Sequence, residues 1–244
     1  MDTSAYWRKL LRSDEPVDLE AVKKCRTHFK LLRPFFFAIF KLVSRLFFPV
    51  TLEGAENLPE RGAYIVAPNH VSILDYPSVI CRLPRQIRDE LFPVASKAYY
   101  DNPVAFFFMA MAANVIRIDT EDDFFSALKA AANVLKAGHA VFLFPEGTRS
   151  KSGELLPFKN GLGILSIEQN VPIVPVHVNG TYDVLPPKKI WFNRGKISVI
   201  IGQPVYPEKY ILKKKSMQAY DVYKELTEEI RNKVLELRNR GDQR

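Results

Sequence analysis

The sequence has little cysteine and little histidine, and neither residue is arranged for metal binding. Its 244 residues contain two cysteines, Cys25 and Cys81, which form no C-x-x-C pair. We therefore expect reduced thiols in an intracellular protein. The four histidines are scattered and form no H-E-x-x-H sequence, so local spacing predicts no metal site.

Long hydrophobic runs are also missing. A membrane-spanning helix needs roughly 18 or more consecutive apolar residues, and the closest stretch, residues 102–116, is shorter. We interpret this stretch as a buried helix followed by the start of a strand. Residues 1–16 lack the apolar centre of a signal peptide. Neither a membrane span nor a secretory signal is expected.

Sequence signatures of several common protein classes are absent. No G-x-S-x-G sequence occurs, which argues against a serine hydrolase of that type. No Walker A sequence occurs, and residues 161–163 supply only G-x-G, so ATP chemistry and dinucleotide binding are disfavoured. The basic segments lack the signatures of the common nucleic-acid modules. We therefore expect no nucleic-acid partner.

The composition is that of a folded, basic protein. Hydrophobic residues make up 47% of the chain and charged residues 25%, which is sufficient for a core. The formal net charge is +8. A basic surface favours anionic partners, such as a phosphorylated substrate or an anionic membrane, but does not choose between them.

The first 48 residues differ from the rest of the chain. Residues 21–45 contain seven basic residues and no acidic one, interleaved with aromatic and aliphatic side chains. A helix with a cationic stripe and a wide aromatic face suits the headgroup boundary of a bilayer. We predict membrane binding by Lys30, Arg33, Phe36, Phe37, Phe40, Lys41, Arg45 and Phe47. The alternative is that these helices pack on the core and the cations face water.

From residue 49 onward, short apolar runs alternate with helical patterns. This alternation predicts an α/β domain over residues 49–244 with a largely parallel central sheet flanked by helices. The predicted helices cover residues 122–138, 161–170 and 216–239. The predicted strands are Val50–Glu53, Ala63–Ala67, Phe92–Ser96, Val115–Ile118, Ala140–Phe144, Ile173–Val178 and Ile197–Ile201.

The stretch "NHVSILD", residues 69–75, follows one of the predicted strands. Ligands of open α/β sheets bind beyond the carboxyl ends of the strands. Asp75 can fold back to accept a hydrogen bond from one ring nitrogen of His70, which leaves the other nitrogen to accept a proton from a hydroxyl. Alternatively, Asp75 is an ordinary helix cap before Tyr76 and Pro77. A serine nucleophile at Ser72 is disfavoured because it lies only two residues from His70.

A second stretch, "FPEGTRS", also follows a strand. Arg149 offers a planar fork suited to phosphate, and Gly147 permits close approach of the backbone to a ligand. Glu146 can accept hydrogen bonds from a hydroxyl or orient Arg149. The alternative is a surface turn with an Arg–Glu pair.

Two further cations are candidates for the same phosphate. Lys97 follows a predicted strand, and Arg117 interrupts an apolar run in another. A charge inside a strand needs a partner or a polar pocket. Arg117 is therefore either a ligand residue or the partner of Asp119.

Together these stretches resemble the glycerolipid acyltransferase family, and within it the 1-acylglycerol-3-phosphate acyltransferases. "NHVSILD" resembles the family's N-H-x-x-x-x-D block, in which the histidine is the general base and the aspartate orients it. "FPEGTRS" resembles the block whose Glu, Gly and Arg help to bind the phosphorylated acceptor. "VPIVPV", with Val171, Pro172 and Ile173, resembles a block associated with the acyl donor. The family's remaining block is altered, because Asn114 and Thr120 stand where a glycine and an arginine are usual.

The resemblance implies transfer of an acyl group from an acyl thioester, carried by coenzyme A or acyl carrier protein, to the 2-hydroxyl of lysophosphatidate. It implies no cofactor and a place at the cytoplasmic face of the cell membrane, as a peripheral or monotopic protein. The open alternatives are another acceptor (glycerol 3-phosphate, another lysophospholipid or a lipid amine), a lipid hydrolase, and a non-catalytic lipid-binding protein.

Overall fold

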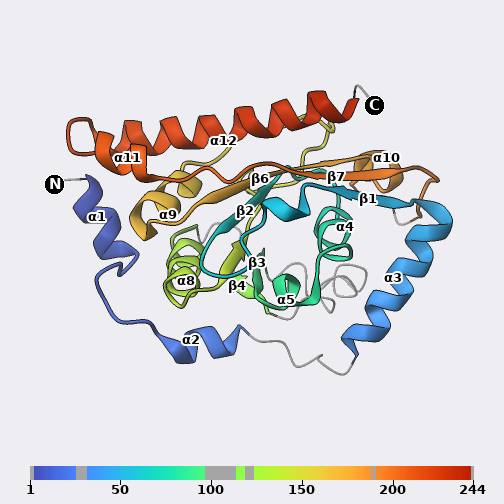
Figure 1. Ribbon diagram of the computed structural model, residues 1–244, viewed down its shortest axis with the longest axis horizontal. Coiled ribbons are helices and arrows are strands. Elements are labelled where there is room, and N and C mark those ends of the chain that lie inside the picture. Colours follow the sequence, from blue (N-terminus) through green and yellow to red (C-terminus); the bar gives the residue numbers. More distant parts are fainter. Residues whose placement is uncertain are drawn as a thin grey trace.

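In the part of the chain that the computed structural model describes, seven strands form one sheet (Figure 1). The described residues are 3–25, 32–96, 114–118, 124–187, 189 and 191–242. The strands are β1 (Val50–Glu53), β2 (Ile65–Pro68), β3 (Leu91–Ser96), β4 (Ile116–Ile118), β5 (Ala140–Phe142), β6 (Ile173–Asn179) and β7 (Ile197–Ile201). The helices are α1 (Thr3–Leu10), α2 (Leu19–Lys24), α3 (Arg33–Phe47), the 3-10 turn η1 (Ala55–Asn57), α4 (Asp75–Ile80), α5 (Arg85–Asp89), α8 (Phe124–Lys136), α9 (Gly161–Gln169), α10 (Thr181–Val184), α11 (Glu208–Lys213) and α12 (Ala219–Asp242).

The strand order is β1-β7-β6-β2-β5-β3-β4. Every neighbouring pair is parallel except β6 and β7, which run antiparallel. The predicted α/β class with a largely parallel sheet is confirmed. Each predicted strand exists, although β5 ends at Phe142 rather than Phe144 because the chain turns there into the loop that carries Arg149. The parallel order brings the carboxyl ends of β2, β5 and β3 to one edge of the sheet.

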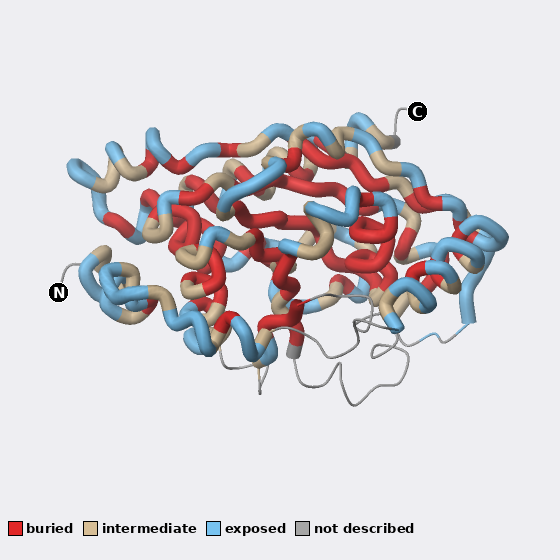
Figure 2. Tube along the Cα trace, turned by 60° about the horizontal axis from the view of Figure 1, so that its bottom comes forward, coloured by how far each residue is buried: buried red, intermediate tan, exposed pale blue. Residues whose placement is uncertain are grey.

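Helices cover both faces of the sheet, and successive strand residues alternate between two cores. Val66 and Phe142 pack toward α3, α4 and α10, whereas Ile65 and Val141 pack toward α8, α9 and α12. Buried residues follow the central strands, and the outer helices are exposed on their far sides (Figure 2). The continuous apolar runs of the sequence are therefore strands that are buried on both faces.

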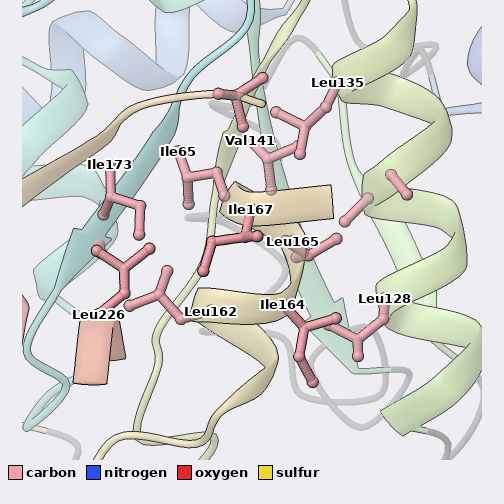
Figure 3. Packing of buried hydrophobic residues seen from close by; sticks show 14 of the residues in the cluster. Ile65, Leu128, Leu135, Val141, Leu162, Ile164, Leu165, Ile167, Ile173 and Leu226 are labelled. Carbon is pink, nitrogen blue, oxygen red and sulfur yellow. The ribbon is translucent and has the colours of Figure 1, made fainter. Parts of the chain in front are cut away.

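The second core depends on close packing of α9 against α12. Leu162 and Ile167 on α9 face Leu226 on α12, and Leu128 on α8 packs on the other side (Figure 3). Gly163 permits this approach, because a Cβ atom there would lie 2.2 Å from the carbonyl oxygen of Tyr223. Burial of one such leucine contributes about 1.5–3 kcal/mol to the free energy of unfolding.

Residues 3–25 pack on the same core. Leu11 and Val22 are buried with residues of α8 and α12. The backbone amide of Asp18 donates to the Asn133 side chain at 2.9 Å, and Asn133 donates back to the Asp18 carbonyl at 2.8 Å. These residues are therefore part of the same folded unit as the sheet.

Helix α3 has one buried side and one exposed side. Phe37 and Phe40 are 6% and 2% exposed and lie in the first core. Arg33 forms an ion pair of 2.5 Å with Asp89. The prediction that these three side chains face lipid is therefore corrected, because they make internal contacts. Phe36 is partly buried against the same core, Lys41, Arg45 and Phe47 are exposed, and Lys30 lies outside the described residues.

Helix α3 has 15 residues, or about 22 Å at 1.5 Å per residue. Among the helices that the structure describes, none combines the length and the apolar character required for a membrane span.

The contact between α9 and α12 can be tested by Gly163→Ala. The added methyl group meets backbone, which cannot rotate away, so we expect a loss of about 1–3 kcal/mol in the free energy of unfolding. Denaturant titration measures the loss. The control is Lys224→Ala on the exposed side of α12, which should stay within about 0.5 kcal/mol of wild type. Equal stability of the two variants would contradict the packing argument.

Candidate active site

The loops after β2 and β5 meet at the carboxyl edge of the sheet. The Asn69 side chain extends the β2–β6 pairing, because it donates to the Val178 carbonyl at 3.0 Å and accepts from the Val178 amide at 2.7 Å. The Ser150 amide donates to the His70 carbonyl at 2.8 Å, which joins the two loops. Between them lies a cavity of about 260 Å³ lined by His70, Arg149 and Lys159 and by apolar side chains.

His70 and Asp75 form a direct pair. The distance from His70 Nδ1 to Asp75 Oδ2 is 2.9 Å. The same oxygen accepts the backbone amides of Val71 at 2.7 Å and Ser72 at 2.8 Å. Asp75 is the first residue of α4, and its carboxylate takes amides that precede the helix rather than amides within it. Asp75 is therefore a support for the histidine loop, not an ordinary N-cap.

The Asp75 carboxylate is completely buried. Its second oxygen, Oδ1, accepts a hydrogen bond of 2.5 Å from the hydroxyl of Thr181 at the start of α10. Because a carboxylate only accepts, the proton of the neutral imidazole lies on Nδ1. Nε2 then has a lone pair that can receive a proton from a hydroxyl.

Burial sets the protonation of His70. Desolvation lowers the pKa of His70 below its ordinary value, while the Asp75 carboxylate acts in the opposite direction. Phe144 contributes to the desolvation, since its ring stacks on the imidazole with centroids 3.6 Å apart and planes 13° apart. A histidine with a lowered pKa is neutral at pH 7, as a general base must be.

Ser72 is occupied by a structural contact. Its hydroxyl donates to the Leu185 carbonyl at 2.6 Å and also accepts the Leu74 amide at 3.2 Å. The side chain is buried. These contacts support the argument against a serine nucleophile at this position.

Glu146 holds the backbone of the loops that form the site. One carboxylate oxygen accepts the His70 amide at 2.6 Å and the other accepts the Leu156 amide at 2.9 Å. The side chain is buried and is not part of the cavity wall, and desolvation raises the pKa of Glu146 to about 7. The prediction that Glu146 contacts the phosphorylated acceptor is corrected, because both oxygens hold backbone.

The cations of the cavity come from the loops after β5. Arg149 is half-buried and, together with Gly147 and Lys159, lines the cavity. Gly147 has a φ of +73°, and a Cβ atom there would lie 2.6 Å from Lys159 Nζ. The glycine therefore lets the lysine side chain cross the backbone beside Arg149. Together the two cations form a positive group at the cavity, as phosphate binding requires.

Of the two remaining predicted cations, the structure describes only Arg117. Arg117 is exposed and lies on β4 between Ile116 and Ile118, of which Ile118 lines the cavity. The cross-strand partner of Arg117, Ala95, lines the cavity, but Arg117 itself does not. The charge of Arg117 lowers the pKa of Cys25 against the larger effect of burial. A phosphate-binding role of Arg117 stays a prediction. Lys97, Asp119 and Thr120 lie outside the described residues.

Val171, Pro172 and Ile173 lie at the opposite edge of the sheet from His70. Ile173 pairs with Ile65 at the start of β2, whereas His70 follows the end of that strand. Three residues of strand span about 10 Å. The Val171 carbonyl accepts the Ser166 hydroxyl at 2.6 Å, and the Pro172 carbonyl accepts the Ile65 amide at 2.9 Å. The predicted contact of these residues with the acyl donor is corrected, because they join β6 to its neighbours.

Apolar side chains form the larger part of the cavity wall. They come from β3, β4, α4, α8 and α9 and from the loop that follows β5, and the small residues Ala127 and Ala131 on α8 leave room between them. The apolar contributors include Ile73, Tyr76, Val94, Ala95, Ile118, Phe124, Ala127, Leu128, Ala131, Leu143, Phe144, Leu162 and Leu165. A cation group and an apolar wall in one cavity suit an amphipathic ligand.

The sequence analysis missed Thr181 and Phe144 as site residues. Thr181 follows β6, whose carboxyl end lies beside that of β2, so the strand order is needed to find it. Phe144 precedes the recognised "PEGTR" stretch. Within the described ranges, no group of three or more His, Cys, Asp or Glu side chains is placed to hold a metal ion.

Comparison with known proteins identifies the family. The sequence model of the acyltransferase family matches residues 49–179. A chloroplastic 1-acyl-sn-glycerol-3-phosphate acyltransferase, BAT2, of Brassica napus is 32% identical over 79% of this chain and 52% of its own length. The Saccharomyces cerevisiae 1-acyl-sn-glycerol-3-phosphate acyltransferase is 36% identical over 71% of this chain and 56% of its own length. The chain thus spans about half the length of these curated relatives.

A solved structure is similar over almost the whole chain. The 1-acyl-sn-glycerophosphate acyltransferase PlsC from Thermotoga maritima superposes with a TM-score of 0.63 and 26% sequence identity. The alignment covers 96% of this chain and 88% of that one. The family match includes the strands and loops that carry His70, Asp75 and Arg149. The chain therefore belongs to the acyltransferase family.

Proposed function

We propose that the protein transfers a fatty acyl group from an acyl thioester to the 2-hydroxyl of 1-acyl-sn-glycerol 3-phosphate, giving phosphatidate. The main support is the His70–Asp75 pair beside a cavity with cations and an apolar wall. The names of the relatives support the same acceptor. The donor is a thioester of coenzyme A or acyl carrier protein, and no cofactor is required.

In the proposed reaction the acceptor supplies the nucleophile. Nε2 of His70 removes the proton of the 2-hydroxyl as the oxygen attacks the thioester carbonyl carbon. The tetrahedral intermediate collapses with loss of the C–S bond, and the leaving thiolate takes the proton from His70. No acyl group is attached to the protein, which agrees with the structural use of the Ser72 hydroxyl.

The cationic part and the apolar part of the cavity bind different parts of the substrates. Arg149 and Lys159 bind the acceptor phosphate, which places its hydroxyl beside Nε2. The apolar wall between β3, α8 and α9 receives an acyl chain. Phe144 covers one face of the imidazole and excludes water from it, which disfavours hydrolysis of the thioester.

A lipid acceptor requires access to a bilayer. The exposed side of α3 carries Lys41 and Arg45 beside exposed apolar side chains, including Phe35 and Leu42. We propose that this side rests on an anionic membrane, which is the cytoplasmic face of the cell membrane.

The proposed reaction is tested with His70→Ala and Asp75→Asn. Loss of the base, or of the carboxylate that fixes its tautomer, should lower the rate of phosphatidate formation by about 10²- to 10⁴-fold. The measurement uses purified protein, an acyl thioester and 1-acylglycerol 3-phosphate in detergent micelles. Circular dichroism checks that each variant is folded.

The chain offers a matched control in His139. Its Nδ1 lies 2.6 Å from the Glu90 carboxylate, but the pair is at the opposite, amino-terminal end of β5. His139→Ala should retain the wild-type rate. Wild-type turnover by folded His70→Ala would refute the mechanism, and free fatty acid as the sole product would identify water as the acceptor.

Thr181 is proposed as a positioning residue that acts through Asp75. Thr181→Val removes the hydroxyl that donates to Oδ1 and should lower the rate by about tenfold. The loss also leaves more negative charge facing the imidazole, which raises the pKa of His70 and moves the acid limb of the pH–rate profile to higher pH. Thr181→Ser should restore both quantities.

The control for Thr181 is Thr227→Val. Thr227 is equally buried, and its hydroxyl donates to the Tyr223 carbonyl at 2.8 Å, far along the chain in α12. This variant should lose stability without any movement of the acid limb. A Thr181→Val profile that keeps the wild-type acid limb would show a purely structural role.

A further inference from the structure

Residues 191–196, in the loop between α10 and β7, present an exposed tryptophan at the end of the molecule where α3 finishes. Trp191 is 80% exposed. The loop is fixed beside α3, because the Gly195 amide donates to the Phe47 carbonyl at 3.2 Å. The ring of Phe192 lies 5.3 Å from that of Phe48, centroid to centroid. In Figure 1 this loop joins α10 to β7 beside the end of α3.

The exposed side of α3 leads toward this loop. Phe35, Leu42 and Leu46 are exposed, and at 100° per residue their positions fall within about 40° around the helix. Phe47, also exposed, is the last residue of α3, and its carbonyl accepts the hydrogen bond from the loop. Figure 2 shows α3 at the right of the molecule, with most of its residues exposed. The tryptophan therefore continues an apolar stripe rather than standing alone.

Cations accompany the apolar residues on both segments. Neither residues 32–48 nor residues 186–196 contain an acidic residue. The exposed cations of the two segments are Lys41, Arg45, Lys189, Arg194 and Lys196. An exposed tryptophan among cations suits the interface of an anionic bilayer, where the ring lies at the headgroup level and the cations meet lipid phosphates. A second copy of the chain would bring like charges together.

We propose that residues 191–196 form a second membrane-docking element, which binds an anionic phospholipid bilayer through Trp191 together with the exposed side of α3. The proposal rests on the proposed function in one respect, namely that the acceptor is a lipid held in a bilayer.

Two hydrogen bonds connect the loop to the catalytic pair. The segment just before it donates the Thr181 hydroxyl to Asp75 and accepts the Ser72 hydroxyl at the Leu185 carbonyl. The docking loop and the supports of the catalytic pair thus belong to one continuous stretch of chain.

The chain contains two tryptophans, so each can be observed separately. Trp7→Phe leaves Trp191 as the reporter, and Trp191→Phe leaves Trp7, which stacks on Phe125 away from the loop. Vesicles of equal parts phosphatidylcholine and phosphatidylglycerol should shift Trp191 emission to shorter wavelength, and brominated lipids should quench it. Trp7 emission should stay unchanged. Vesicles of phosphatidylcholine alone should give a much weaker effect.

Vesicle co-sedimentation of the full chain measures the contribution to affinity. Trp191→Ser should weaken binding by about tenfold, through the loss of apolar burial. Arg194→Gln should weaken it by about fivefold, as expected for one cation near an anionic surface. The matched control is Lys224→Gln on the exposed side of α12, which should bind like wild type.

The proposal is overturned if anionic vesicles do not change the emission wavelength or the quenching of Trp191. It is also overturned if Trp191→Ser and Arg194→Gln bind these vesicles like wild type. Self-association that disappears in Trp191→Ser, without vesicle binding, would also overturn it in favour of a second copy. Transferase activity in micelles is measured separately. If Trp191 docks on vesicles but no acyl transfer is found, the docking proposal is supported and the proposed function is overturned. If acyl transfer is found but Trp191 does not dock, the docking proposal is overturned and the proposed function is supported.

Discussion

The site depends on one buried carboxylate. Asp75 is removed from water, which costs several kcal/mol for an isolated ion, and four donors offset this cost: the His70 ring, two backbone amides and the Thr181 hydroxyl. These donors come from the loop after β2 and from α10 after β6. The carboxylate can be satisfied only when the two neighbouring strands are in register, so the fold and the orientation of the histidine are fixed together.

A second carboxylate has a different task. Glu146 is also buried, but it accepts backbone amides from the histidine loop and from Leu156. It thereby sets the separation between the loop that carries the base and the loop that carries Arg149. The two acidic residues therefore have different structural roles. Asp75 determines which nitrogen of His70 is available, and Glu146 determines where that nitrogen lies relative to the cations.

Much of this arrangement could be predicted from the sequence, for reasons that are local. Strands buried on both faces read as largely apolar runs, so β7 was predicted with its observed bounds. The spacing of His70 and Asp75 is short enough for one turn to close, and the pair is observed. The errors arise where the answer depends on which side of an element faces the ligand. Val171 lies at the opposite end of the sheet from His70, which only the pairing of β6 with β2 reveals. Phe37 and Phe40 lie in a helix that also has exposed apolar residues, Phe35, Leu42 and Leu46, so apolar character alone does not mark the packed face.

The direct test of this account is the protonation of the His70 ring, measured by nitrogen-15 NMR of the folded protein as a function of pH. Burial and the Asp75 contact predict a neutral ring at pH 7 with the proton on Nδ1, and a pKa of His70 below its ordinary value. In Asp75→Asn the preference for this tautomer should be lost. A proton on Nε2, or a charged ring at pH 7, would contradict the assignment of His70 as a base that Asp75 holds ready for the acceptor hydroxyl.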